Sequence, residues 1–274
     1  MTFSYTNLFR LDGKVAMVTG GAGILGSHFC RGLAEAGATV IIVDVNADAV
    51  ASLESSIRLE YSDQVLGIVA DVSNPTQVKS LVEEATQRFG HIDILHNNAA
   101  SKGSNLDTYF APFEEYSIDQ WREIMVANVD SMFLMAQAVG KKMIERNSGG
   151  SIIQTASAYG VFGPDNRIYE GSSYLGRQIN TPAVYSTSKA AVVGLSKFLA
   201  TYWAHHGIRV NTLVPGGAES GQNETFQQRY GARVPLGRMA HQTEIVGAVL
   251  YLASDASRYV TGHCLMVDGG LSAW

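Results

Sequence analysis

The 274-residue sequence contains few cysteines, few charged residues and no long hydrophobic run. Its two cysteines, Cys30 and Cys264, lie in apolar stretches, so we expect two reduced core thiols and neither a disulfide nor a metal pair. No apolar segment approaches the roughly 20 residues that a transmembrane helix needs, which argues against a membrane protein. The first residues contain no apolar signal core, and we therefore expect a cytoplasmic protein.

Basic residues are also scarce, because 20 Lys and Arg stand against 25 Asp and Glu, for a formal net charge of −5. Proteins that bind nucleic acid gather Lys and Arg against phosphate, so this balance argues against a nucleic-acid partner. Charged residues make up 16% of the chain and hydrophobic ones 46%, which excludes a disordered chain and allows a large core. The seven histidines are scattered, and no metal site is predicted.

Short apolar, β-branched segments alternate with longer segments of helical periodicity along the chain. The predicted strands are 14–19, 39–44, 65–69, 92–96, 151–155, 208–213 and 264–267, and the predicted helices are roughly 24–36, 46–60, 76–89, 118–145, 184–206 and 242–253. This alternation predicts an α/β fold, a single Rossmann-type doubly wound parallel sheet of about seven strands with helices on both faces. Without a repeat or a linker, 1–274 is predicted as one dinucleotide-binding and catalytic domain.

A glycine-rich turn joins the first predicted strand to the first predicted helix. The turn reads TGGAGILG over 19–26, and its glycines let the backbone approach a pyrophosphate at the helix N-terminus. Asp44 ends the second strand, 24 residues beyond Gly20, where a carboxylate accepts hydrogen bonds from ribose hydroxyls and repels a 2′-phosphate. No Arg or Lys occupies 21–25 or 45–47, so NAD is favoured over NADP.

Two more segments follow strands at the sheet edge where ligands bind in such folds. Asp71 and Val72 follow the third strand, where a carboxylate would reach an adenine amino group, and small residues after the fourth strand would let the chain pass close to a cofactor. The cofactor residues predicted from these segments are Gly20, Gly23, Ile24, Leu25, Gly26, Asp44, Val45, Asp71, Val72, Asn98, Ala99 and Ala100.

Tyr185 and Lys189 are spaced to project from one face of a predicted helix. A free phenol has a pKa of about 10, too high for ready proton exchange at neutral pH. The Lys189 ammonium and a positively charged nicotinamide would both stabilise the phenolate, and a pKa lowered by about 3 units corresponds to roughly 4 kcal/mol. Two residues with this spacing usually just lie on the surface of a helix. Because this pair follows a dinucleotide-binding half of the chain, it predicts an acid–base catalyst.

Through these residues and several others, the sequence resembles the short-chain dehydrogenase/reductase family over essentially its whole length. The matching residues are the 19–26 turn, Asp71, Asn97-Asn98-Ala99, Asn128, Ser157, Tyr185, Lys189, Pro215-Gly216 and 267–270. The resemblance implies that Ser157 holds the reacting oxygen, Tyr185 is the general acid/base, Lys189 holds the ribose and tunes Tyr185, and Asn128 braces a relay water. It also implies cofactor contacts from Tyr185, Lys189, Pro215, Gly216, Gly217 and Ala218, and chemistry that requires no metal.

The sequence departs from the family pattern in three places. Ile24 stands where the family usually has its second glycine, Ala100 replaces a usual glycine, and 28 residues separate Ser157 from Tyr185, more than the family commonly shows. The resulting insertion, 163–181, is similar to that of members from bacterial surface-sugar pathways, and 216–236 corresponds to the family's mobile lid. Both segments are expected to shape the substrate site, although a solvated or oligomer-contact loop stays an alternative for the insertion.

The polar composition of the insertion and the lid predicts a polar, sugar-like or anionic small-molecule substrate, with Arg available for a carboxylate or phosphate. The predicted substrate residues are Ser157, Tyr159, Arg167, Tyr169, Arg177, Glu219 and Phe226. The predicted reaction is the NAD(H)-dependent interconversion of a secondary alcohol and a ketone by direct hydride transfer.

Two alternative functions stay open. A 3-oxoacyl-thioester reductase is weakened by Asp44 and the acidic balance, because such reductases commonly use NADPH. A catalytically silent nucleotide-binding scaffold is the other. From the resemblance we also expect a homotetramer built through helices 118–145 and 184–206, with the apolar ending 271–274 against a neighbour.

Overall fold

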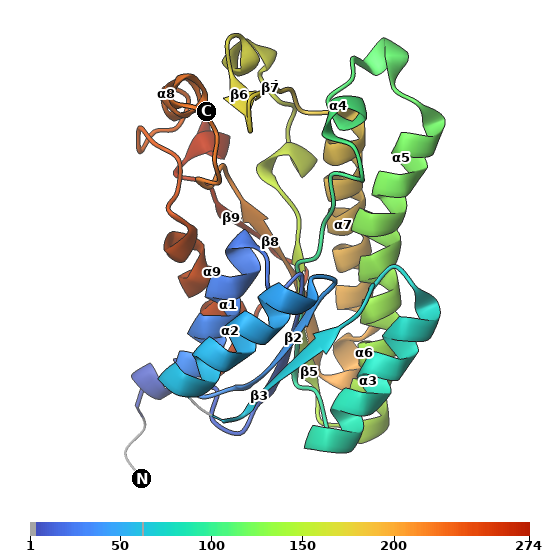
Figure 1. Ribbon diagram of the computed structural model, residues 1–274. Helices are drawn as coiled ribbons and strands as arrows, with labels where there is room; N and C mark the ends of the chain where they lie inside the picture. The colour runs from blue at the N-terminus through green and yellow to red at the C-terminus, as the bar shows by residue number, and fades with distance from the viewer. Residues whose placement is uncertain (1–3, 62) are drawn as a thin grey trace.

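A parallel sheet of seven strands forms the centre of the computed structural model, which describes residues 4–61 and 63–274 (Figure 1). The strands are β1 (Val15–Thr19), β2 (Thr39–Asp44), β3 (Val65–Val69), β4 (Ile94–Asn97), β5 (Gly150–Thr155), β8 (Ile208–Pro215) and β9 (Cys264–Val267). Their order is β3-β2-β1-β4-β5-β8-β9, and every neighbouring pair is parallel. The predicted doubly wound sheet is confirmed, and the chain reverses its direction of winding between β1 and β4, where ligands bind in such sheets.

Helices cover both faces of this sheet, as predicted (Figure 1). One layer contains α1 (Ile24–Glu35), α2 (Ala47–Glu60) and α9 (Val246–Ala253), and the other contains α3 (Pro75–Phe89), α6 (Ser131–Arg146) and α7 (Ala183–Tyr202). Phe29 and Leu33 of α1 are fully buried on the first face, and Met135 of α6 is fully buried on the second. Each such side chain contributes about 1.5–3 kcal/mol through its burial, which holds the layers against the sheet.

Three predicted helices are less regular than their periodicity indicated. The 118–145 helix is interrupted, because α5 (Ile118–Met125) passes through a π-helical turn (Val126–Asp130) before α6 begins. The 184–206 helix ends at Tyr202, and a 3-10 turn (Ala204–His206) closes on the left-handed Gly207. The 242–253 helix begins as a 3-10 turn (Gln242–Ile245). The other predicted boundaries agree with the structure to within two residues, the usual uncertainty of element ends.

The insertion and the lid lie above the carboxyl ends of the strands and pack against each other (Figure 1). The insertion forms a small hairpin of β6 (Ser173–Tyr174) and β7 (Arg177–Gln178), and the lid contains α8 (Glu224–Gly231), with the short α4 (Leu106–Tyr109) nearby. They share a separate apolar cluster, whose buried members are Ile168, Tyr169, Ile179, Phe226, Tyr230, Val234, Met239 and Leu271. We refer to these eight residues as the upper cluster.

The remaining short elements are 3-10 turns at Thr6–Phe9, Phe113–Glu115, Ala158–Gly160, Asn166–Tyr169, Asp255–Ser257 and Leu271–Ala273. Both cysteines are free, and Cys30 is buried as expected, whereas Cys264 is only half-buried, which corrects that part of the prediction. Among the described residues, no helix is long and apolar enough to cross a membrane, and no group of His, Cys, Asp or Glu is placed to hold a metal ion.

Candidate active site

The glycine turn between β1 and α1 is closed by backbone contacts that only glycine permits. Gly20 adopts φ +61°, and a Cβ there would lie 2.8 Å from the Cα of Ala99. A Cβ at Gly26 would overlap the carbonyl oxygen of Gly20. Gly23 caps α1 without a side chain that accepts a hydrogen bond, so first-turn N–H groups of the helix are available to an anion.

The turn is fixed to the segment that follows β4. The Thr19 Oγ1 accepts hydrogen bonds from the backbone N–H groups of Asn98 and Ala99, at 3.0 and 3.1 Å. In return, the Asn98 Nδ2 donates to the carbonyl of Gly20 at 3.3 Å. Because β1 and β4 flank the reversal of the sheet, these bonds fix both walls of the cleft in which a ligand is expected.

A cavity next to the end of β2 suits an adenosine group. Its lining residues are Gly20, Val43, Asp44, Val45, Ala70, Asp71, Val72, Ser73, Ala99, Ala100, Ser101 and Ala127, and this lining contains no Lys or Arg. Asp44 accepts hydrogen bonds from the N–H groups of Ala22 and Asn46, each at 3.1 Å, which orient its carboxylate at the cavity. One oxygen of Asp71 is already bound by the N–H and hydroxyl of Ser73, at 2.8 and 2.7 Å.

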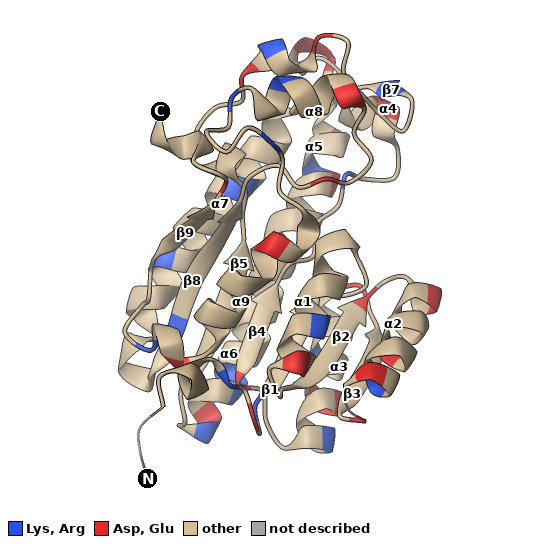
Figure 2. Cartoon of the chain, turned by 90° about the vertical axis from the view of Figure 1, so that its left-hand side faces the viewer, with Lys and Arg blue, Asp and Glu red and all other residues tan. Residues whose placement is uncertain are grey.

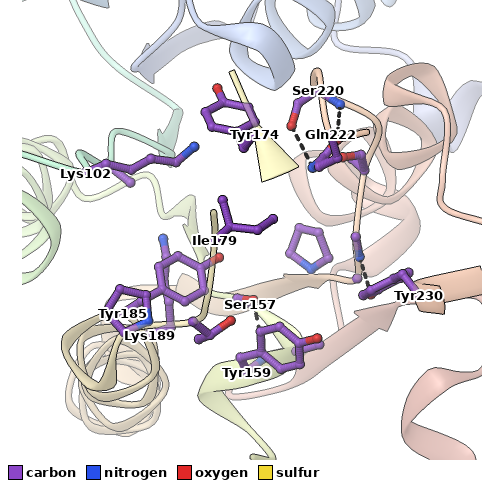
Figure 3. Close-up of a pocket in the computed structure, with 18 of the residues that line it drawn as sticks. Lys102, Ser157, Tyr159, Tyr174, Ile179, Tyr185, Lys189, Ser220, Gln222 and Tyr230 are labelled. Atoms are coloured by element: carbon purple, nitrogen blue, oxygen red, sulfur yellow. Dashed lines mark hydrogen bonds between the residues drawn. The ribbon is translucent and has the colours of Figure 1, made fainter. Parts of the chain in front are cut away.

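A second cavity, of about 460 Å³, begins on the other side of the glycine turn. It is lined by the predicted cofactor residues Ile24, Leu25, Asn98, Ala100, Pro215, Gly216, Gly217 and Ala218, and by Ser157, Tyr185 and Lys189. Figure 3 shows Tyr185 and Lys189 rising from α7 beside Ser157, below the residues of the hairpin and the lid. The two cavities and the helix N-terminus between them fit the two ends and the pyrophosphate of a nicotinamide dinucleotide.

Lys189 is held inside the protein by a backbone carbonyl. Its side chain is 3% exposed, and Nζ donates to the carbonyl oxygen of Thr155 at 3.1 Å. Burial lowers the pKa of Lys189 from 10.5 to about 8, because the ammonium loses its water. The hydroxyl of Thr155 is in turn hydrogen-bonded to the Nε2 of His96 at 2.8 Å, so a buried polar chain supports the lysine.

Tyr185 has a raised pKa in the protein alone. Burial is the larger cause, and the hydrogen bond with Ser157 lowers the pKa in part. Desolvation of the phenolate outweighs the favourable contacts that the chain alone supplies, whereas the predicted lowering depends on Lys189 together with a bound, positively charged nicotinamide. The hydroxyl of Ser157 also accepts from the N–H of Tyr159 at 3.3 Å, which orients it at the cavity.

Asn128 lies in the π-helical turn and is fully buried. Its Oδ1 accepts from the N–H of Ser101 at 2.7 Å, and its Nδ2 has no hydrogen-bond partner among the described residues. A π-helical turn changes the side-chain register within a helix and is frequent at functional sites. Asn128 therefore has a buried donor without a partner among the described residues, and it also fixes the loop after β4.

Of the predicted substrate residues, Ser157, Tyr159, Tyr169 and Phe226 line the larger cavity, and Arg167, Arg177 and Glu219 do not. Arg167 is paired with Asp165 at 2.6 Å, and its side chain is 85% exposed. Arg177 is paired with Asp107 at 2.8 Å, also outside the cavity. The structure does not bring these three residues to the cavity, because burying a charged side chain without a partner would cost its hydration. Figure 2 shows where charged residues lie along the lid and the insertion, at the top of the view.

The cavity contains residues that the sequence did not single out as substrate contacts. They are Lys102, Tyr109, Phe110, Tyr174, Ile179, Asn180, Thr181, Pro182, Ser220, Gln222, Tyr230 and Met239. Most of these side chains are aromatic or carry one polar group, and Lys102 is the charged one among them. Lys102 follows Asn98 by four residues at the same sheet edge, a signal that could have found it. The hydroxyl of Tyr230 accepts from the N–H of Gly217, which fixes α8 against the first residues of the lid.

Comparison with known proteins identifies the family. A sequence profile described as enoyl-(acyl carrier protein) reductase matches residues 20–272. The D-threitol dehydrogenase of Mycolicibacterium smegmatis is 35% identical over 267 residues, which cover 96% of this chain and 94% of that protein. The chain belongs to the short-chain dehydrogenase/reductase family.

Members of this family with different names are almost equally similar to the chain. The 3-oxoacyl-[acyl-carrier-protein] reductase of Thermotoga maritima is 33% identical over 96% of this chain and 99% of that protein. A gluconate 5-dehydrogenase from Burkholderia cenocepacia, in complex with NADP and tartrate, superposes with a TM-score of 0.86 at 34% identity, covering 99% of this chain and all of that one. This short-chain dehydrogenase/reductase is an oxidoreductase that acts on CH–OH groups and uses NAD or NADP.

Proposed function

We propose that this enzyme is an NAD(H)-dependent dehydrogenase that interconverts a secondary alcohol and a ketone in a polyhydroxy, sugar-like compound. The observation that carries the proposal is the shared cavity, in which Ser157, Tyr185 and Lys189 face the same space as the glycine turn. The predicted residues therefore meet where a cofactor and a substrate would be side by side.

Four side chains have different roles in the proton transfer. NAD⁺, when bound, would accept the hydride that leaves the carbinol carbon of the substrate. Ser157 and Tyr185 hold the substrate oxygen, and Tyr185 takes the hydroxyl proton during oxidation or returns it during reduction. Lys189, with its pKa of about 8, places a positive charge beside the reaction that favours the phenolate, and Asn128 offers a buried donor for the relay water.

The choice of NAD over NADP rests on Asp44. Its carboxylate lines the adenosine cavity, and no Lys or Arg lines that cavity among the described residues. A 2′-phosphate would lie close to this negative charge without a cation to balance it. The related gluconate 5-dehydrogenase with its NADP shows that family likeness does not decide the cofactor, so this chain's own residues carry the argument.

The sugar-like substrate is supported by the cavity's side chains. Asn180, Ser220 and Gln222 offer amide and hydroxyl groups to a hydroxyl-rich molecule, and the aromatic rings offer faces to its C–H groups. The names of the related D-threitol and gluconate dehydrogenases point to the same substrate class.

Two alternatives are decided by one experiment. The formation of NADH or NADPH is followed with purified enzyme, NAD or NADP, and a panel of polyols, sugar acids, steroids and 3-hydroxyacyl thioesters. We expect turnover with NAD on a polyhydroxy compound. Turnover confined to acyl thioesters with NADP would support the reductase that the family profile and the Thermotoga relative suggest. Silence on every compound with tight NADH binding would favour a nucleotide-binding scaffold.

A homotetramer is proposed from exposed apolar side chains on α6 and α7. Phe133 is 47% exposed, and the stacked rings of Phe198 and Tyr202 are 60% and 59% exposed, with 5.4 Å between ring centroids. Large exposed apolar surfaces mark association sites. Size-exclusion chromatography with light scattering should give four times the chain mass, and a monomer would reject this state. A cytoplasmic location stays a prediction.

A further inference from the structure

Lys102 lies at the mouth of the larger cavity and has no acidic partner there. Figure 3 shows its side chain extending toward Tyr174 of the hairpin, on the side of the cavity above Tyr185. Its Nζ lies 3.9 Å from the centroid of the Tyr174 ring. Among the described residues that line the cavity, Lys102 and Lys189 are the charged ones, and no carboxylate balances them.

The other cations near the cavity are already neutralised outside it. Arg229 of the lid pairs with Glu170 of the insertion at 3.1 Å, and Arg233 pairs with Asp165 at 3.3 Å. Arg167 and Arg177 are paired as described above. Within the part of the chain that the structure describes, Lys102 has no ion pair and Lys189 is engaged by a carbonyl. Lys102 is therefore the cation left to meet a negative group in the cavity.

The loop that carries Lys102 is fixed on both sides. The N–H of Ser101 donates to Asn128 at 2.7 Å, and the N–H of Ser104 donates to the carboxylate of Glu123 at 2.9 Å. Between them, Gly103 adopts φ +79° and donates to the hydroxyl of Ser101 at 2.9 Å. A cation on a pre-ordered loop loses less entropy when it binds a ligand than one on a free loop.

We propose that Lys102, held over the ring of Tyr174, binds a carboxylate of the substrate, and that the substrate is a polyhydroxy acid oxidised at a secondary hydroxyl. The ring stabilises the ammonium by a cation–π contact and covers one side of it. The ammonium has three N–H donors, so those that do not face the ring remain free to bind the carboxylate. Lys102 thereby sets which end of the substrate lies away from Tyr185. This proposal rests on the sugar-like substrate proposed above.

Matched pairs of acids and neutral polyols test this role. D-gluconate with D-glucitol, D-ribonate with ribitol, and L-threonate with L-threitol are assayed with NAD and the wild-type enzyme. We expect a lower KM for the acid in the productive pair. Lys102→Met should raise the KM for that acid about tenfold, as loss of a charged hydrogen bond does, with kcat changed less than twofold. The KM for the neutral partner should not change.

Two further variants separate charge from structure. Lys102→Arg should keep most of the affinity for the acid, and Lys79→Met, which removes an exposed charge on α3, should leave both KM values at wild-type levels. A Lys102→Met variant with an unchanged KM for the acid overturns the proposal, as does a wild type that oxidises neutral polyols equally well. Those outcomes leave the sugar-like substrate intact, whereas failure of all polyols and acids rejects the proposed function itself.

Discussion

Burial changes the pKa values of Tyr185 and Lys189 in opposite directions. It raises the pKa of the phenol, which keeps the phenol protonated near neutral pH, and it lowers the pKa of the ammonium to about 8, which makes the neutral amine more accessible. The phenolate and the ammonium must therefore be stabilised by the ligand that binds beside them. The pair is therefore sensitive to the occupant of the cavity, which links proton transfer to ligand binding.

Replacing Tyr185 by Phe removes one oxygen and leaves the ring in place. We expect kcat to fall by about 10²–10⁴-fold, the usual contribution of a general acid or base, with NADH affinity changed little. Steady-state kinetics and fluorescence titration of NADH measure the two effects. Tyr259→Phe is the matched control, because that ring is fully exposed and should leave kcat unchanged. A Tyr185→Phe enzyme with wild-type kcat would remove Tyr185 from the mechanism.

Asp44→Asn removes the charge at the adenosine cavity and keeps one of the two oxygens that accept from the N–H groups of Ala22 and Asn46. We expect the ratio of kcat/KM for NAD to that for NADP to fall about tenfold, equivalent to roughly 1.4 kcal/mol of lost charge repulsion. Asp48→Asn removes an exposed charge from the first turn of α2 and serves as control. An unchanged ratio in Asp44→Asn would mean that another feature selects the cofactor.

At the scale of elements, the regular pattern was predictable and its interruption was not. The sequence around Asn128 has the periodicity of one continuous helix, whereas the structure inserts a π-helical turn there. A π-helical turn adds one residue to the ring that a backbone hydrogen bond closes, without a residue type that marks it. Local propensity therefore favours a continuous helix. The hydrogen bond from Ser101 to Asn128 joins residues far apart in the sequence, so no local pattern could predict it.

The lid is fastened to the insertion by Asn223, the N-cap of α8. Its Oδ1 accepts from the N–H groups of Phe226 and Ser173, each at 3.1 Å, and its Nδ2 donates to the carbonyl of Gly171 at 3.3 Å. Asn223→Ala should cost about 0.5–2 kcal/mol for the cap alone and release the hairpin in addition. We expect faster hydrogen exchange across 164–181 and 218–232, together with a higher KM for substrate.

The control for this variant is Asn46→Ala, which removes the N-cap of α2. The Asn46 Oδ1 accepts from the N–H of Ala49 at 3.1 Å, and α2 lies on the opposite side of the sheet reversal from the lid. It should lower overall stability by a similar amount and leave exchange in the lid unchanged. Equal exchange in the lid of both variants would show that Asn223 only caps its helix.

At the scale of the whole molecule, the buried His96 should govern acid stability. Burial lowers its pKa from 6.5 to about 3, so the unfolded chain holds more protons between these two pH values. The free energy of unfolding then rises with pH in that window and is lost on acidification, by about 2 kcal/mol at pH 5 relative to pH 7.

Urea denaturation between pH 7 and pH 5 measures this loss. His96→Gln should show a smaller pH dependence even if its stability at pH 7 is lower, because Gln does not titrate. His205→Gln, at an exposed site, should retain the wild-type slope. Parallel slopes in wild type and His96→Gln would place the acid sensitivity elsewhere.

The sheet and its cofactor edge could be predicted because they depend on short patterns. Apolar strands, the glycine turn and Asp44 are each read within a few residues, and the order of a doubly wound sheet follows from chain rules. The direction of long side chains depends on distant partners. Arg167 and Arg177 share the polar composition that predicted a polar site, yet Asp165 and Asp107 turn them outward, while Lys102 faces inward.

The upper cluster has a consequence for heat sensitivity. Its eight residues form a second, smaller core that joins the insertion to the lid and is separate from the two layers on the sheet. Small cooperative units open at lower free energy than the main core. On heating, catalytic turnover should therefore disappear at a temperature where circular dichroism still reports an intact sheet, and cooling should restore it. Heat would then switch the activity off reversibly through the segments above the sheet, while the sheet itself stays folded.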